Sequence, residues 1–423
     1  MRFRKDTLKN GVRLLVSPMP HLDSVAVMIG VGAGSRYEEK RVPGVAHFIE
    51  HMMFKGTKKR PTALVISSEI DSIGARFNAF TDKESTIYYV KAAAKNLPKM
   101  LDLLTDIVFH SKFDPQEIER EKRVILEELR MYRDIPQRWV AHIYDRLLFG
   151  DHPLGWDILG TEQILPAIKR EDFITYLGSW YRSENIVVAV AGKIEERRAL
   201  RETWEIFGRL NKKDVQPPLR YKSSQKEPAI TLEERKIDQT HFILGLRAYH
   251  RGHSNREKLE VLATILGGGA SSRIFDAIRE ERGLAYYVGA GWGPFSDTGS
   301  VLIWAGVNTA RSEEAIKAVL EELQKLKEKP VPANELKKVK EMLRGNLFLG
   351  IESTDGACSY LLTQEVLEGK IETPEEKLRK IDAVTAEDVR GVAQELFVTK
   401  GLNLALIGPF SDPNRFRKLL KLS

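Results

Sequence analysis

Two histidines and a glutamate stand at metal-ligand spacing near the start of this chain. His47 and His51 are four residues apart, and Glu50 completes the pattern His-x-x-Glu-His. Residues four apart on an α-helix lie about one turn from each other on one face, so both imidazoles can reach the same ion. A carboxylate beside two nitrogen ligands can take the proton of a water that the ion activates. This order inverts the zincin motif and predicts a catalytic zinc site on a helix.

The alternative is an amphipathic helix that carries two histidines by chance, although histidine is scarce, with 9 in 423 residues. A third ligand would favour zinc, and residues 117–133 are predicted to form a helix that offers one. Glu121, Val124, Ile125 and Glu128 recur there at helical spacing and are predicted to share one face. Buried carboxylates normally need a cation or a metal as partner.

The chain repeats its own pattern. The apolar strand predicted at 186–192 recurs at 402–408, and the strand at 24–31 has a counterpart at 240–246. Each half starts with strands, continues with a helix, a hairpin and several helices, and ends on a strand. This order predicts an α+β fold of two homologous, layered α/β domains, with mixed or antiparallel sheets flanked by helices.

Three segments follow from this repeat. We expect an N-terminal metal-binding domain at 1–210, a linker at 211–228 and a homologous C-terminal domain at 229–423. The linker is rich in lysine, serine and proline and lacks apolar periodicity.

The two halves differ in their chemistry. Residues 258–262 stand near the position equivalent to the histidine motif and contain no histidine, while Val339 and Asn346 replace Glu121 and Glu128. The acids vanish where the histidines vanish, which indicates that the acids serve the metal. Only the first half is therefore expected to bind it.

Composition narrows the classes of function. The net charge is +7, but basic and acidic residues are interspersed, which argues against a nucleic-acid partner. No run of about 18 apolar residues and no signal peptide is found, so we expect a cytoplasmic protein without a membrane partner. The single cysteine, Cys358, is predicted to be a small core residue.

Longer motifs add a resemblance to these observations. The chain resembles the pitrilysin/insulinase family of inverted zinc metallopeptidases, and in particular its half-length branch, which includes mitochondrial processing peptidase and bacterial processing proteases. Besides the histidine motif, the likeness is carried by residues 44–46, 56–57, 121–128, 150–155 and 267–273.

The resemblance implies a role for each residue of the first half. His47, His51 and Glu128 would bind one Zn²⁺ per chain, and no other cofactor is expected. Glu50 would be the general base, and Glu121 would orient a histidine ligand from outside the coordination sphere. Mn²⁺ or Co²⁺ can replace Zn²⁺ in such sites.

Substrate contacts are implied in both halves. Asn78, Ala79, Phe80 and Thr81 resemble the edge strand to which the family adds a peptide as an extra strand. The pattern of residues 76–90 independently predicts a hairpin there.

In the second half, Arg279 and Tyr286 resemble a pair that would hold a substrate carbonyl and stabilise the oxyanion. Their neighbours Arg282 and Tyr287 are not excluded from these roles. The alternative is that both residues are structural, with the arginine at the end of a helix and the tyrosine half-buried in a strand.

The implied function is that of a zinc-dependent endopeptidase that hydrolyses unfolded peptides or protein segments inside a dimeric chamber. A homodimer is expected because both sets of residues lie in one chain, and a heterodimer stays open. The alternative is a peptidase-like subunit that is catalytically silent, or active only with a different partner, and that binds peptides or proteins. Silent subunits usually lack parts of the motif, which this chain keeps.

Overall fold

The computed structural model describes residues 1–208, 210 and 215–422. The chain divides into two compact units, each assembled from three segments. The first consists of Met1–Arg130, Trp156–Leu219 and Phe348–Thr373, and the second of Met131–Gly155, Arg220–Leu347 and Pro374–Ser423. Residues 211–214 of the expected linker lie outside the described residues.

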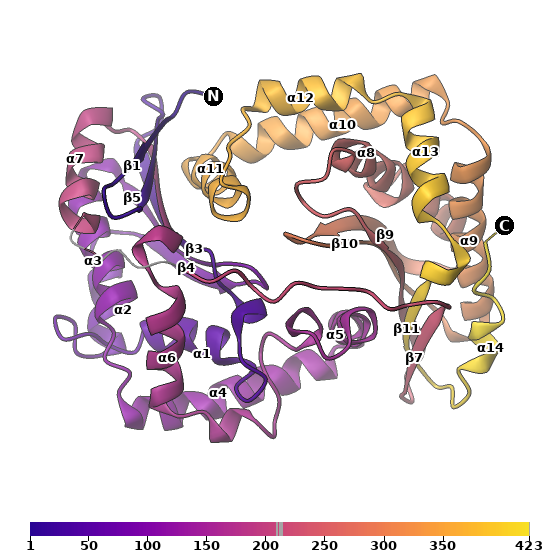
Figure 1. Ribbon diagram of the computed structural model, residues 1–423, viewed down its shortest axis with the longest axis horizontal. Coiled ribbons are helices and arrows are strands. Elements are labelled where there is room, and N and C mark those ends of the chain that lie inside the picture. Colours follow the sequence, from indigo (N-terminus) through magenta and orange to yellow (C-terminus); the bar gives the residue numbers. More distant parts are fainter. Residues whose placement is uncertain (209, 211–214, 423) are drawn as a thin grey trace. The chain divides into compact units, whose positions relative to one another are not determined.

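The first unit contains a six-stranded mixed sheet in the order β1-β2-β6-β3-β5-β4 (Figure 1). Only β2 and β6 run parallel. The central strand β6 is buried along its whole length, which explains its unbroken apolar sequence. The strands are β1 Arg4–Thr7, β2 Arg13–Pro18, β3 Ser24–Val31, β4 Arg76–Thr81, β5 Thr86–Ala93 and β6 Ile186–Gly192.

The first unit also contains the two helices that are expected to carry the metal ligands. The helix that carries the histidine motif is α1, Val45–Met53, and the acidic helix is α4, Pro115–Asp134. The remaining helices are α2 Ala63–Ser72, α3 Leu97–His110, α6 Arg170–Trp180, α7 Glu196–Phe207 and α11 Thr354–Glu368.

The second unit has a five-stranded sheet in the order β7-β11-β8-β10-β9, with β7 and β11 parallel. It repeats the arrangement of β2-β6-β3-β5-β4 in the first unit, so the predicted α+β fold with two related mixed sheets is confirmed. The strands are β7 Ala229–Glu234, β8 Gln239–Ala248, β9 Ala285–Pro294, β10 Gly299–Asn308 and β11 Asn403–Gly408.

The helices of the second unit cover its sheet and enclose a large apolar core. One of them, α13, begins with a capping box in which Thr385 and Asp388 satisfy each other's backbone N–H groups. The helices are α5 Pro136–Phe149, α8 Arg256–Gly267, α9 Ser312–Glu328, α10 Ala333–Ile351, α12 Pro374–Ala383, α13 Ala386–Leu396 and α14 Asn414–Arg417.

Two helices pack on the sheet of the other half of the sequence. Helix α5 precedes the second half but buries Val140 and Tyr144 with Ile243 and Ala405 of β8 and β11. Helix α11 lies in the second half but packs on the first sheet (Figure 1). Its residue Cys358 is fully buried there. The consecutive domains expected at 1–210 and 229–423 do not include this exchange.

Within the described part of the chain, the helices are all too short or too polar to cross a lipid bilayer.

Candidate metal centre

Helix α1 separates an apolar face from a polar one. Phe48, Ile49 and Met52 are buried in the core of the first unit, whereas the two histidines and Glu50 lie on less buried positions between them. The helix follows Gly44, which has a φ of 96° and provides no side-chain cap. Its first N–H groups therefore need a partner from elsewhere.

Glu38 supplies that partner. Its carboxylate accepts the Gly44 N–H on Oε2 and the Ala46 N–H on Oε1, each at 2.8 Å, and the residue is only 6% exposed. Burial raises the pKa of Glu38 to about 8, although the two backbone N–H bonds oppose that rise. Glu38 thus fixes the end of the helix from which His47 projects.

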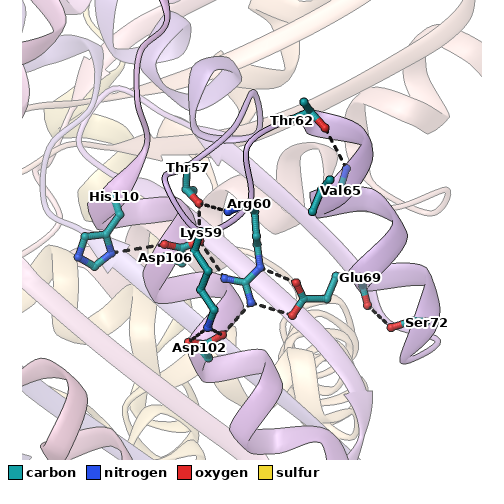
Figure 2. Close-up of polar contacts among 10 residues, drawn as sticks. All are labelled: Thr57, Lys59, Arg60, Thr62, Val65, Glu69, Ser72, Asp102, Asp106 and His110. Carbon is teal, nitrogen blue, oxygen red and sulfur yellow. Dashed lines mark hydrogen bonds and ion pairs between the residues drawn. The ribbon is translucent and has the colours of Figure 1, made fainter.

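The loop after α1 is fixed by a second buried group, Arg60, which is 1% exposed. Its guanidinium donates to Glu69 of α2 and to Asp102 and Asp106 of α3, and Asp106 also accepts from the hydroxyl of Thr57 (Figure 2). Buried polar side chains therefore hold both the start of the metal-motif helix, through Glu38, and the loop that follows it, through Arg60.

Helix α4 brings the two acids to this face of α1. Glu121 and Ile125 are buried and Glu128 is half-buried. The prediction that Val124 shares this face is wrong, because its side chain is 49% exposed. Three residues from Glu121, it lies at the margin of the buried stripe.

The predicted ligands converge on one point. His47, His51 and Glu128 each offer one atom that could bind a metal, and these three atoms lie within 4.8 Å of one another. The Oε2 atom of Glu128 is 3.4 Å from Nε2 of His51 and 3.8 Å from Nε2 of His47. Ligands about 2.1 Å from a tetrahedral ion lie about 3.4 Å apart, so these three residues fit Zn²⁺ and leave a fourth position for water.

Glu121 lies behind this group. Its Oε1 is 2.9 Å from Nδ1 of His51, and its Oε2 is 2.6 Å from Nζ of Lys55. A carboxylate on Nδ1 keeps the proton there and leaves Nε2 free for a metal. Burial works against ionisation of Glu121, but the bonds from His51 and Lys55 prevail and lower its pKa.

The two histidines differ in their protonation. Burial, together with the neighbouring His51, lowers the pKa of His47 to about 4, so its imidazole is neutral at pH 7. Burial also opposes a charge on His51, but Glu121 and Glu128 outweigh it and raise the pKa of His51 to about 9. Without a metal, His51 therefore carries a proton that an incoming ion must displace.

Glu50 is held by the edge strand. The Thr81 hydroxyl donates to Oε2 of Glu50 at 2.5 Å. Burial raises the pKa of Glu50, while the hydrogen bond from Thr81 opposes that rise. A carboxylate whose pKa is raised by burial is a stronger proton acceptor than an exposed one.

The expected substrate strand forms the edge of the first sheet. β4 pairs with β5 along one side, with Asn78 opposite Tyr89 and Thr81 opposite Thr86. Asn78 and Phe80 are exposed, and Ala79 is buried. The exposed edge is compatible with the addition of a peptide strand.

Arg279 and Tyr286 lie together in the second unit. Arg279 sits at the end of a π-helical segment, Phe275–Glu280, and its Nη1 donates to the main-chain carbonyl of Tyr286 at 2.7 Å. Tyr286 is the second residue of β9 and is 76% exposed. Arg282 instead pairs with Glu321, and the hydroxyl of Tyr287 pairs with His241.

Glu38 and Lys55 are the residues of this site that the sequence patterns did not single out. Glu38 could have been sought, because no Ser, Thr, Asp or Asn immediately precedes α1 to cap it. Lys55 is four residues after His51 and just past the helix, and nothing in its local pattern indicates its partner.

Comparison with known sequences gives matches along most of the chain. Residues 14–162 match the family model of insulinase (peptidase family M16), and residues 167–343 match that of the peptidase M16 inactive domain. An uncharacterized zinc protease of Bacillus subtilis is 35% identical and covers 96% of this chain and 98% of its own length. One from Mycobacterium leprae is also 35% identical and covers 99% and 94%, respectively.

Solved structures show the same fold. A protease from Helicobacter pylori has a TM-score of 0.89 at 22% identity and covers 96% of this chain and 99% of its own. A peptidase M16 inactive domain structure from Pseudomonas fluorescens has a TM-score of 0.90 at 19% identity and covers 97% and 99%, respectively.

Proposed function

The chain belongs to the insulinase family of peptidases (peptidase family M16), and we propose that it is a zinc-dependent endopeptidase acting on unfolded peptides or protein segments. The observation that carries the proposal is the convergence of His47, His51 and Glu128 within 4.8 Å, with Glu50 on the same helix. The names of the relatives as zinc proteases support the metal.

Each side chain would have a defined task. His47, His51 and Glu128 would hold Zn²⁺, which when bound lowers the pKa of a water ligand to about 7 and polarises a carbonyl. Glu50 would accept a proton from the attacking water and deliver it to the leaving amine. Glu121 would keep the His51 ring in the tautomer and orientation that expose Nε2.

Substrate contacts would come from two elements. A peptide would add to β4 at Asn78–Thr81 through main-chain hydrogen bonds, which select extended, unfolded segments. Arg279 would bind a substrate carbonyl, and the exposed hydroxyl of Tyr286 would donate to the oxyanion.

We further propose a homodimer that encloses a chamber, in which the Arg279–Tyr286 pair of each subunit serves the zinc of its neighbour. Both sets of residues are present in this one chain, so no second gene product is required. Size-exclusion chromatography with light scattering should show the activity in the dimer peak, whereas a fully active monomer would refute this assembly.

The test of the proposed function is metal-dependent peptide cleavage by the purified chain. The protein is stripped with a chelator, assayed on a library of unstructured peptides, and assayed again after one equivalent of Zn²⁺ is added. Cleavage that disappears and returns supports the proposal. A chain that binds zinc tightly yet cleaves no peptide would instead be a binding subunit or one partner of a heterodimer.

A further inference from the structure

We propose that Thr81 is a positioning residue for Glu50, so that the strand expected to receive the peptide also sets the orientation of the general base. This inference rests on the proposed function and deepens it. It gives Thr81 a task different from the substrate contact that the family resemblance implies.

The geometry starts from the Thr81 side chain. Thr81 is the last residue of β4, and its hydroxyl donates to Oε2 of Glu50 at 2.5 Å. The Thr81 main chain makes a further hydrogen bond to the same carboxylate. Both contacts hold the Glu50 carboxylate against the end of β4.

Glu50 needs such a restraint. A glutamate side chain has three rotatable bonds, and a general base must be held within a narrow geometry to transfer a proton efficiently. Among the residues that the structure describes, Thr81 is the one that donates hydrogen bonds to the Glu50 carboxylate. Thr81 is therefore the contact that selects one rotamer of the base.

The strand itself is tied to the metal-motif helix at both ends. Thr81 contacts Glu50 of α1, and near the start of β4 the ring of Phe77 lies 5.4 Å from the ring of Phe54, which caps the C-terminus of α1. A displacement of β4 would thus be transmitted to α1. A peptide that pairs with β4 would bind to a strand already fixed against the catalytic helix.

We expect the hydroxyl of Thr81, and not the shape of its side chain, to determine the effect on kcat. Thr81→Val keeps the volume and the β-branch, which suits a strand, but removes the donor. Losing a hydrogen bond to a charged group is expected to lower kcat about 10- to 100-fold. KM and bound zinc should stay unchanged, because neither the peptide edge nor the metal ligands are altered.

Two further variants separate positioning from packing. Thr81→Ser keeps the donor and should restore kcat to within about threefold of wild type, given that only a methyl group is lost. Thr175→Val is the matched control, since its exposed hydroxyl donates to the carbonyl of Glu171 in the same helix, and it should cleave like wild type.

The experiment compares kcat, KM, zinc content and thermal unfolding for these proteins. A Thr81→Val enzyme with wild-type kcat, a loss confined to KM, or a Ser variant as impaired as Val would overturn the inference. If Val fails to fold, Thr81→Ala takes its place with the same expectations. If the wild-type chain cleaves nothing, the proposed function falls first, and this inference falls with it.

Discussion

Glu121 connects two basic side chains, His51 and Lys55, beside the candidate metal site. One of its oxygens contacts His51 and the other contacts Lys55, and the carboxylate is almost completely buried. Its counterpart in the second half of the chain is Val339, where no histidine needs to be oriented. The carboxylate is thus expected to act on the metal through His51 alone.

Replacing this carboxylate should weaken zinc binding without removing a ligand. We predict that Glu121→Gln lowers zinc affinity about 10- to 100-fold, because the amide no longer holds the His51 Nδ1 proton with a full charge. Competition with a coloured chelator measures the affinity. Glu119→Gln on the same helix is the control, as the Glu119 side chain is exposed and pairs with Lys122, and equal affinities for both variants would argue against the role of Glu121.

Zinc uptake should depend on pH in a defined direction. The metal-free pKa of His51 is raised to about 9, so at pH 7 the ring is protonated and zinc must displace that proton. Affinity should rise about tenfold per pH unit from pH 7 to 9 and then level off. Calorimetry in buffers of different ionisation enthalpy should show about one proton released per zinc at pH 7, and no release would contradict this protonation state.

At the residue scale, the sequence predicted the candidate metal ligands but not the residues that hold them and Glu50 in position. The spacing of His47 and His51, and the loss of both acids in the second half, pointed to the group that the structure brings together. Lys55 and the Thr81–Glu50 contact were not foreseen, because they depend on how α4 and β4 pack against α1, and no periodicity encodes that packing.

At the scale of elements, the metal-motif helix depends on a cap from a distant loop. Glu38 satisfies two N–H groups that the sequence around Gly44 leaves without a side-chain partner. An amide at this position has one acceptor oxygen, so one of the two buried groups loses its bond. The helix end that carries His47 would then be less firmly held.

We predict that Glu38→Gln destabilises the fold by about 1–3 kcal/mol, which is the cost of leaving a buried N–H unsatisfied. Thermal and denaturant unfolding measure the change. Glu39→Gln is the neighbouring control, since Glu39 is exposed and pairs with Arg41, and it should stay within about 0.5 kcal/mol of wild type. Equal stability of the two variants would show that Glu38 is not the cap.

Most individual elements could be predicted from the sequence. The expected strand at 24–31 and the strand at 186–192 match β3 and β6, and the helix at 117–133 lies within α4. The exchange of α5 and α11 could not be predicted. Periodicity identifies the apolar face of a helix, but it does not identify which of two similar sheets that face will cover.

At the scale of the whole molecule, the described residues of the second unit include no group of His, Cys, Asp and Glu at metal-ligand distances, but they include the exposed Tyr286. We predict that Tyr286→Phe lowers kcat about 10²- to 10³-fold, the usual effect of losing one oxyanion donor, with zinc content unchanged. Tyr287→Phe is the control, because its hydroxyl is engaged by His241. If Tyr287→Phe lowered kcat more than Tyr286→Phe, the oxyanion donor would be Tyr287 and the assignment to Tyr286 would be wrong.

The most direct measurement compares cleavage of a quenched fluorescent peptide by the wild-type chain and by Glu50→Gln, with zinc measured in both. Gln keeps the size of the side chain and leaves His47, His51 and Glu128 in place, so both proteins should hold equal zinc. The account predicts that wild type cleaves and that Glu50→Gln is at least about 10²-fold slower. A zinc-loaded Glu50→Gln protein that cleaves as fast as wild type would contradict the central claim.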